Sequence, residues 1–426
     1  MRRVLILGTG PAAIQMAVLL KQQMGCEVGI VGRKSTRSEP FFAALRATKL
    51  RVRADVQNGK HRLLEGDCPI DRLYEGYGTI TGEWDTVIAA VTTDAYLEVL
   101  RVMPEDCLRP IRRLILLSPT FGSNSMVRSY MKERQLEAET ISFSTYLGDT
   151  RWTHATPSDR VITTAVKRKL YMGSTHAHSH AVTELAALYN RLGIAAEVMQ
   201  TPLEAESRNI SLYVHPPLFM NPCALSAVFG EAAHKLFVYK MFPEGPITQH
   251  AMRDMLAYWK EMTELAERLG IGGVNLLKFM VDDNYPVRPE SLSRADIERF
   301  HELAPIHQEY LLYVRYASLL IDPYSEPDEN GRYFDFSAVP IRQIFVNASG
   351  EHDIPRMPKE DYYRIKIIQG IARFVGVSCP TLDRFIEVYE RKLAEAAGAL
   401  QGQRLSEAFA VRSFAEDLLL ICKTLQ

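Results

Sequence analysis

The sequence predicts an α/β protein in which a parallel β-sheet with packed helices is followed by a predominantly helical domain. The chain opens with a short apolar strand, a glycine-containing turn follows that strand, and helical periodicity begins directly after the turn. At 426 residues the chain is longer than a single hydrophobic core commonly supports. We therefore expect two domains, residues 1–204 and residues 205–426, with a substrate cleft between them.

The turn after the first strand predicts a dinucleotide-binding site. Val4–Leu7 is a continuous apolar run, typical of a strand that is buried on both faces. The turn reads Gly8-Thr9-Gly10-Pro11-Ala12-Ala13, a G-x-G-x-x-A pattern. Gly8 permits the tight turn, Gly10 lets the backbone approach a pyrophosphate, and Ala13 allows close packing of helix on strand. We therefore expect a Rossmann-type domain over residues 1–204, with the pyrophosphate against the turn and the helix N-terminus.

The end of the second predicted strand, Glu27–Val31, indicates which dinucleotide binds. Sites that prefer NAD usually place an acidic residue there, whereas an arginine accommodates the 2′-phosphate of NADP. Here Arg33, Lys34 and Ser35 follow the strand, and the first carboxylate is Glu39. A basic loop that only faces solvent is the alternative. The pattern favours NADPH, with these three residues at its phosphate.

Two further predicted strands end in polar turns. Trp84–Val91 is followed by Thr92, and Arg113–Leu117 is followed by Ser118 and Pro119. Ligands of open α/β sheets bind beyond the carboxyl ends of the strands. We therefore expect Thr92 and Pro119 to line the nicotinamide side of the cofactor site.

The rest of the chain changes from mixed to helical periodicity near residue 205. Before that point we expect strands at Thr140–Ser144, Val161–Met172 and Ala195–Gln200 and a helix at His180–Leu192. After it we expect helices at Thr248–Leu269, Glu298–Leu320, Tyr362–Phe374 and Thr381–Ala397.

Composition and charge restrict the classes of function. The formal net charge is −1, so no overall field attracts nucleic acid or an anionic membrane. No apolar run approaches the roughly 20 residues that span a bilayer. Gly8, Gly10 and Pro11 interrupt the N-terminal apolar stretch, so we expect no export signal. The six cysteines are scattered, which favours reduced thiols in a cytoplasmic protein. We expect small-molecule substrates, and neither nucleic acid nor a membrane as a partner.

A run of alternating histidines invites a metal-binding interpretation. In His176-Ala177-His178-Ser179-His180 the alternation could bring three imidazoles to one face of a strand. However, the run precedes a predicted helix and lacks neighbouring carboxylates or thiolates. We expect it to lie in a loop or at a helix start, and we assign no metal site.

The segment SLYVHPPLFMN, residues 211–221, places one histidine before two prolines in an apolar run. Proline fixes its own backbone and disfavours helix in the preceding residue, so we expect His215 on a stiff, extended segment. It is either a core histidine with a satisfied hydrogen bond or a proton-transfer residue.

Several longer motifs resemble those of the opine dehydrogenases, above all the branch that makes opine metallophores of the staphylopine, pseudopaline and yersinopine types. The motifs are GTGPAAIQ, VGRKSTR, SFSTYLGDTR, KRKLYMGSTH, SLYVHPPLFMN, NYPVRPE and PRMPKEDYYR. The resemblance implies a Rossmann domain joined to an all-helical catalytic domain, and a homodimer. It also implies an NADPH-dependent reductive condensation of a histidine–aminobutyrate amine with pyruvate or 2-oxoglutarate. In such a reaction the metal binds to the released product.

The resemblance further implies that His215 transfers protons. The family pairs this histidine with an aspartate near a Val-Pro pair, but here alanine stands in that place, in Asp335–Pro340. Asp335 or Asp149 could act instead, or the histidine could work without a carboxylate partner. Asp149 and Arg151 could equally form a plain exposed ion pair.

Substrate carboxylates need cationic partners. The candidate arginines are Arg151, Arg208, Arg288, Arg315 and Arg332. We favour Arg151 and Arg208, because they flank the expected cleft. Two alternatives to the opine dehydrogenase interpretation are a simple α-keto acid or ketopantoate-type NADPH reductase and a non-catalytic NADPH-sensing protein.

Overall fold

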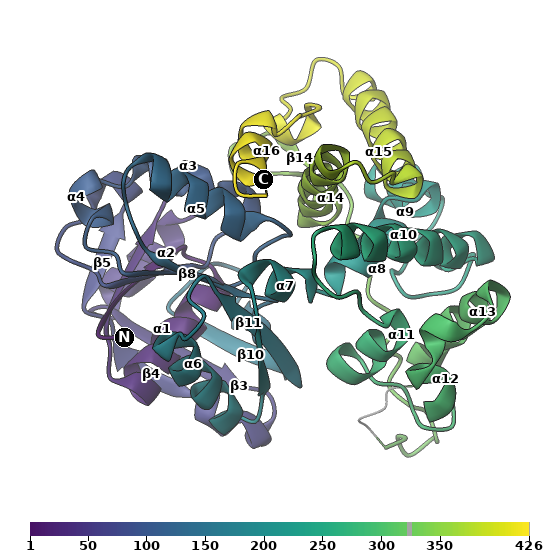
Figure 1. Ribbon diagram of the computed structural model, residues 1–426, viewed down its shortest axis with the longest axis horizontal. Coiled ribbons are helices and arrows are strands. Elements are labelled where there is room, and N and C mark those ends of the chain that lie inside the picture. The colour runs from purple at the N-terminus through teal and green to yellow at the C-terminus, as the bar shows by residue number, and fades with distance from the viewer. Residues whose placement is uncertain (322–325, 426) are drawn as a thin grey trace. The chain divides into compact units, whose positions relative to one another are not determined.

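The computed structural model describes residues 1–321 and 326–425, and the chain divides into two compact units (Figure 1). Met1–Asn209 and the residues from Glu416 onward form the first unit, and Ile210–Ala415 form the second. The boundary expected at residue 204 falls inside helix α7 (Pro202–Ser207), which belongs to the first unit. The return of helix α16 (Ala415–Cys422) to the first unit, where Glu416 pairs with Arg101, is not predicted by the sequence.

An eight-stranded sheet forms the centre of the first unit. Its order is β12-β11-β8-β7-β6-β1-β2-β5, and all neighbouring pairs are parallel except β8 with β11. The strands are β1 (Arg3–Leu7), β2 (Glu27–Gly32), β5 (Arg72–Glu75), β6 (Thr86–Ala89), β7 (Arg113–Leu116), β8 (Glu139–Phe143), β11 (Lys169–Ser174) and β12 (Ala195–Met199). From β5 to β8 this is the strand order of a doubly wound dinucleotide-binding sheet, so the predicted fold class is confirmed.

Helices bury both faces of this sheet. They are α1 (Pro11–Met24), α2 (Glu39–Ala47), α3 (Tyr96–Val102), α4 (Glu105–Leu108), α5 (Ser123–Glu133), α6 (His180–Arg191) and α7. In β1, Val4 and Ile6 join the core around α1 and α6, whereas Leu7 lies beside residues of α3 and α5 on the opposite face. Because both faces are covered, the strand reads as a continuous apolar run and not as an alternation.

A second sheet of four strands packs against α1. Its order is β4-β3-β10-β9, with β3 (Arg51–Val56), β4 (Gly66–Pro69), β9 (Gly148–Trp152) and β10 (Arg160–Val166). The single strand expected over Val161–Met172 is wrong, because its two halves are β10 and β11 and lie in different sheets. The chain changes sheets at the polar pair Lys167-Arg168, where the Lys167 N–H binds the Leu147 carbonyl.

The second unit is built of helices and one short hairpin. The helices are α8 (Ser211–Phe219), α9 (Pro222–Val228), α10 (Gln249–Arg268), α11 (Leu276–Lys278), α12 (Arg294–Glu298), α13 (Pro305–Ala317), α14 (Arg356–Val375) and α15 (Pro380–Ala399), and the hairpin strands are β13 (Phe345–Val346) and β14 (His352–Asp353). The helix expected over Glu298–Leu320 is interrupted, because Pro305 holds Ala304 in an extended conformation and α13 begins at the proline.

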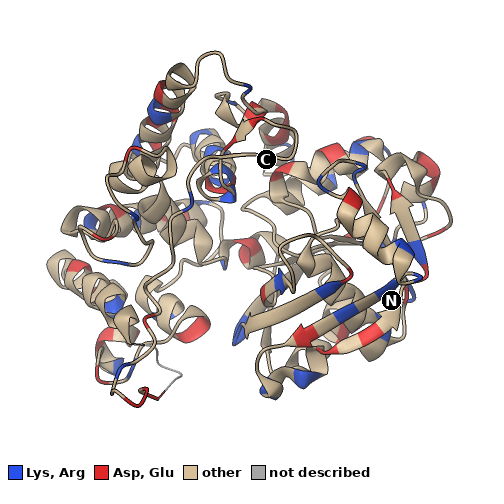
Figure 2. Ribbon diagram, turned by 180° about the vertical axis from the view of Figure 1, so that it is seen from behind, with Lys and Arg blue, Asp and Glu red and all other residues tan. Residues whose placement is uncertain are grey.

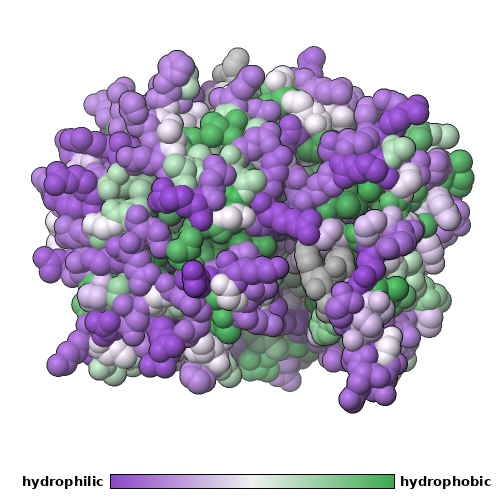
Figure 3. Space-filling model, turned by 90° about the horizontal axis from the view of Figure 1, so that it is seen from below, coloured by the Kyte–Doolittle hydropathy of each residue, from purple (hydrophilic) through white to green (hydrophobic). Residues whose placement is uncertain are grey.

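Charged residues of both signs are spread over the elements of the protein (Figure 2). The face in Figure 3 mixes hydrophobic with hydrophilic residues. Within residues 1–321 and 326–425, no helix combines the length and the hydropathy needed to cross a bilayer.

Candidate active site

The glycine turn after β1 has the geometry of a pyrophosphate-binding turn. Gly8 has φ +126°, and a Cβ atom there would lie 2.6 Å from the carbonyl oxygen of Ala90, so only glycine fits. A Cβ atom at Gly10 would meet nothing within 4 Å, which leaves the space in front of α1 open. Thr9, Gly10, Pro11 and Ala12 are all partly exposed. These features fit a phosphate group held by the backbone N–H groups that begin α1.

The N-terminus of α5, by contrast, is occupied by a carboxyl group of this chain. Glu206 is fully buried and accepts hydrogen bonds from the N–H groups of Gly122 (2.9 Å) and Asn124 (2.7 Å) and from the Ser142 hydroxyl (2.8 Å). Burial raises the pKa of Glu206 to about 8, although the three donors favour its ionised form. Because Glu206 already satisfies this helix end, we place the phosphate at α1.

Buried polar groups without partners lie at the carboxyl ends of β6 and β7. The Thr93 and Thr120 hydroxyls and the Asn124 amide nitrogen make no hydrogen bond to the described residues. A buried polar group without a partner costs about 1–3 kcal/mol, so such groups are commonly satisfied by a ligand or water. They neighbour Thr92 and Pro119, which the sequence indicates for the nicotinamide side. The polar ring substituents and ribose of a dinucleotide fit this donor and acceptor set.

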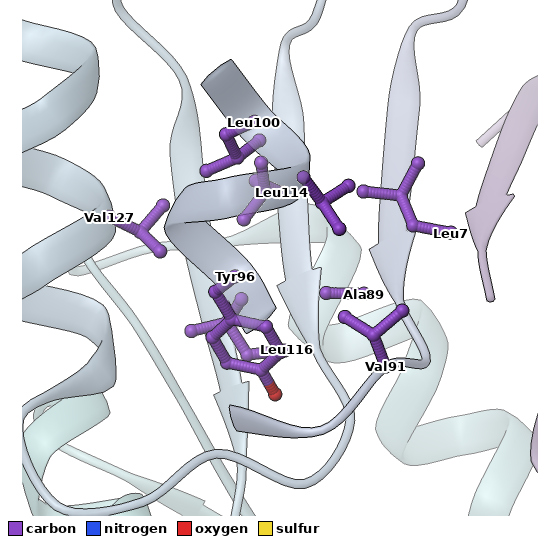
Figure 4. A pocket seen from close by; sticks show the side chains of 9 residues that line it. Leu7, Ala89, Val91, Tyr96, Leu100, Leu114, Leu116 and Val127 are labelled. Atoms are coloured by element: carbon purple, nitrogen blue, oxygen red, sulfur yellow. The ribbon is translucent and has the colours of Figure 1, made fainter. Parts of the chain in front are cut away.

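A small cavity near these strand ends is a packing defect and not a binding site. It has a volume of about 10 Å³ and is lined by side chains such as Leu7, Val91, Leu116 and Val127 (Figure 4). An apolar cavity of this size holds at most a single water and stays dry.

The loop after β2 carries Arg33, Lys34 and Ser35 on the surface. Arg33 donates to Glu98 of α3 at 2.6 Å, and both side chains are more than half exposed. Ser35 and Ser38 hydroxyls lie 3.0 Å apart, and Ser38 also binds the Arg33 carbonyl, which fixes the loop. An exposed ion pair contributes little stability, so Arg33 can exchange Glu98 for a phosphate at small cost.

His215 lies in a helix, so the extended conformation expected for its segment is wrong. Residues 211–219 form α8, with Pro216 and Pro217 inside it. The two prolines remove the N–H groups that would bind the Leu212 and Tyr213 carbonyls, but their fixed φ is compatible with a helical turn. All residues of α8 from Leu212 to Phe219 are buried except His215, whose side chain is 16% exposed.

The carboxylate beside His215 is Asp361 of α14. The Nδ1 atom of His215 lies 3.1 Å from Oδ1 of Asp361, and the Asp361 side chain is buried. Arg364 donates to the same oxygen at 3.2 Å and to Glu360 at 2.6 Å. Burial acts to raise the pKa of Asp361, but His215 and then Arg364 lower it, and the net pKa is below its usual value. Asp361 is therefore ionised near neutral pH.

The other site residues favoured from the sequence have different neighbours. Asp335 lies in the same unit as His215, but its partners are Lys240 and Ser337. Asp149 on β9 forms an exposed ion pair with Arg151, with 2.9 Å between Arg151 Nε and Asp149 Oδ2. Arg208, directly after α7, lies 3.7 Å from Glu204.

Sequence reasoning missed Asp361, although its position within a helical pattern of apolar residues indicates a buried carboxylate. Asp361, Ile365, Ile368 and Ala372 recur at helical spacing and are all buried. A carboxylate within the apolar stripe of an amphipathic helix needs a buried partner. The expected helix began at Tyr362, one residue too late to include it.

The histidine run lies between β11 and α6. Ser179 caps α6 by accepting from the Val182 N–H, and His180 is the first residue of the helix. Across the described part of the chain, no group of three or more His, Cys, Asp or Glu side chains is arranged to hold a metal ion.

A doubly wound sheet with an open glycine turn, followed in the chain by a helical unit that holds a buried His–Asp pair, is typical of dinucleotide-dependent oxidoreductases. The family model described as staphylopine dehydrogenase matches residues 2–425. The chain is 46% identical to staphylopine synthase of Staphylococcus aureus, over 100% of this chain and 99% of that protein. It is 36% identical to pseudopaline synthase of Pseudomonas aeruginosa, over 92% and 90%. The NADP⁺-bound structure of yersinopine dehydrogenase superposes with a TM-score of 0.92 at 29% identity, over 100% and 99%. The chain belongs to the staphylopine dehydrogenase family.

Proposed function

We propose that this protein catalyses the NADPH-dependent condensation of an amine with an α-keto acid to form an opine metallophore. The amine is that of a histidine–aminobutyrate intermediate, and the keto acid is pyruvate or 2-oxoglutarate. The observation that carries this proposal is the His215–Asp361 pair in a chain of the staphylopine dehydrogenase family. The NADP⁺ found in yersinopine dehydrogenase supports NADPH as the cofactor.

The reaction needs a proton for each water that leaves. The amine adds to the ketone, and the resulting carbinolamine loses water to give an imine. Bound NADPH supplies the hydride that reduces this imine to the secondary amine. Because ionised Asp361 can only accept a hydrogen bond, the proton of the imidazole lies on Nδ1, and Nε2 is the nitrogen that exchanges protons with substrate. His215 protonates the leaving hydroxyl, and the Asp361 charge stabilises the cationic ring.

Turnover with and without the amine tests this function. We expect purified protein to oxidise NADPH when keto acid and amine are both present, and to form a secondary amine detectable by mass spectrometry. Oxidation with keto acid alone would favour the ketopantoate-type reductase. Tight NADPH binding without oxidation under any combination would favour a sensor.

We propose that Arg33 binds the 2′-phosphate of NADPH, and the variant Arg33→Asp tests this role. We expect roughly 10- to 100-fold weaker NADPH binding, because the variant loses a cation and places a carboxylate beside the phosphate. NADH binding should change much less. Calorimetric titration of both cofactors measures the two constants. Glu98→Gln is the matched control: it frees Arg33 from its ion pair and should leave NADPH binding unchanged or tighter. Equal losses for NADPH and NADH in the Arg33 variant would contradict this role.

The proposed reaction requires no metal on the protein. We expect turnover to survive chelator treatment, and the variant with alanine at both His176 and His178 to retain nearly full activity. Steady-state rates before and after dialysis against chelator measure this. Loss of activity that added zinc restores would overturn the interpretation.

We further propose a cytoplasmic homodimer. All six cysteines are free thiols, with Cys26, Cys68, Cys107 and Cys379 buried, which supports a reducing compartment. Light scattering of the purified protein tests the dimer.

A further inference from the structure

One arginine of the second unit is buried, and no acidic side chain among residues 1–321 and 326–425 pairs with it. Arg315, on α13, is 3% exposed. Its guanidinium donates one hydrogen bond, to the Tyr285 carbonyl at 3.3 Å, and lies 4.9 Å from the centre of the Tyr316 ring. Among the described residues its Nε atom has no hydrogen-bond partner, and burial and three tyrosines, but no carboxylate, act on the pKa of its guanidinium. Burying a cation in this way is costly unless an anion compensates it.

The other buried arginine of this unit shows the contrast. Arg364 is 6% exposed and contacts the carboxylates of Glu360 and Asp361. Arg315 instead contacts the Tyr285 carbonyl and the Tyr316 ring, and burial lowers the pKa of its guanidinium. Among the described residues, two carboxylates pair with Arg364 and none with Arg315, so the Arg315 cation is available to a ligand.

The surroundings of Arg315 connect it to the proposed acid–base pair. The Tyr239 ring stacks on Tyr316 with 6.4 Å between centroids, and Tyr285 packs on Phe336 at 4.7 Å. Tyr239 and Phe336 are partly exposed, so this aromatic cluster extends from Arg315 to the surface of the unit. Burial raises the pKa of the Tyr239 phenol to about 12, and the charges of Arg315 and Asp361 shift it further in opposite directions. Asp361 is the partner of His215.

We propose that Arg315 binds a carboxylate of the substrate, in the aromatic cluster formed by Tyr239, Tyr285, Tyr316 and Phe336. This inference rests on the proposed function, in which both the keto acid and the amine carry carboxylates. The planar fork of the guanidinium can hold both oxygens of a carboxylate. Neither Arg151 nor Arg208 combines burial with the absence of an acidic neighbour, since they contact Asp149 and Glu204.

Steady-state kinetics of Arg315→Met and Arg315→Lys test the inference. We expect KM for one carboxylate substrate to rise about 10- to 100-fold in the methionine variant, with the lysine variant in between and the Kd of NADPH unchanged. A rise confined to the keto acid assigns the site to that substrate, and a rise confined to the amine assigns it to the amine. Arg332→Met removes the same charge from an exposed residue paired with Asp328, and should change neither KM. If both KM values stay within twofold in Arg315→Met and Arg315→Lys, the inference is wrong.

Thermal unfolding gives a readout that needs no turnover. Because the unliganded cation is uncompensated, we expect Arg315→Met to unfold at the same temperature as the parent or higher. Pyruvate, 2-oxoglutarate or oxalate should raise the unfolding temperature of the parent and of Arg332→Met, but not that of Arg315→Met. A methionine variant that keeps this shift contradicts the inference. If Arg315→Met does not fold, the unfolding temperature of Arg315→Lys is measured instead. A reduced or lost ligand-induced rise in Arg315→Lys supports the inference, and an unchanged rise contradicts it. A parent protein that shows the Arg315-dependent shift but never oxidises NADPH would reject the proposed function and retain the carboxylate site.

Discussion

Replacing His215 with alanine should lower kcat by about 10²–10⁴, the usual contribution of a positioned acid–base group. The residue is suited to this test because, from Leu212 to Phe219, it is the one residue that is partly exposed. NADPH binding should be almost unchanged, since the glycine turn that fits the cofactor lies in the first unit and His215 in the second. Stopped-flow or steady-state oxidation of NADPH gives kcat, and fluorescence titration gives the cofactor Kd.

The variant His215→Asn separates proton transfer from packing. Asparagine can still hydrogen-bond to Asp361 but cannot titrate near neutral pH. We expect it to fold normally and to be nearly as slow as the alanine variant. Turnover within about threefold of the parent, with normal folding, would rule out proton transfer by His215.

The parts of the fold that the sequence predicts are those specified by neighbouring residues. The strand β1, the glycine turn and the start of α1 follow from one stretch of local pattern, because burial on two faces and a left-handed turn each demand particular residue types. The assignment of β10 and β11 to different sheets is not local. It depends on the Leu147 carbonyl and on strands that pair with each half from elsewhere in the chain.

The candidate site also depends on contacts between residues that lie far apart in the sequence. The sequence identifies His215 by its motif, but its carboxylate partner is 146 residues away along the chain. Spacing cannot reveal such a pair, because only the packing of α14 on α8 brings the two together. The sequence ranks the five candidate arginines only by whether they flank the expected cleft. Burial and the lack of an acidic neighbour distinguish Arg315, and both are properties of the folded chain.

Replacing Asp361 with asparagine should lower kcat by roughly 10²-fold or more, because the cationic imidazole loses its counter-charge. The substitution is well matched to the structure. The Oδ1 atom that accepts from His215 and Arg364 can be kept, while Oδ2, which makes no hydrogen bond to the described residues, is the atom exchanged for nitrogen. The change therefore removes charge with little change of shape. KM values and NADPH binding should move much less than kcat.

The same variant predicts a pH dependence of stability. The pKa of Asp361 is lowered in the folded protein, so its ionised form stabilises the fold at pH values above the unfolded pKa of about 3.9. That contribution is lost as the pH falls through the lower, folded pKa. The difference in unfolding temperature between the parent and Asp361→Asn should therefore be largest near neutral pH and shrink as the pH falls below about 4.

Asp335→Asn and Asp149→Asn are the matched controls, since the sequence offers both as partners of His215. Asp335 binds Lys240 and Ser337, and Asp149 pairs with Arg151, so we expect either change to cost far less turnover than Asp361→Asn. The ratio of the three kcat values decides which carboxylate acts with the histidine. If Asp335→Asn or Asp149→Asn slows turnover as much as His215→Ala while Asp361→Asn does not, the bond between Asp361 and His215 serves the fold and not the reaction.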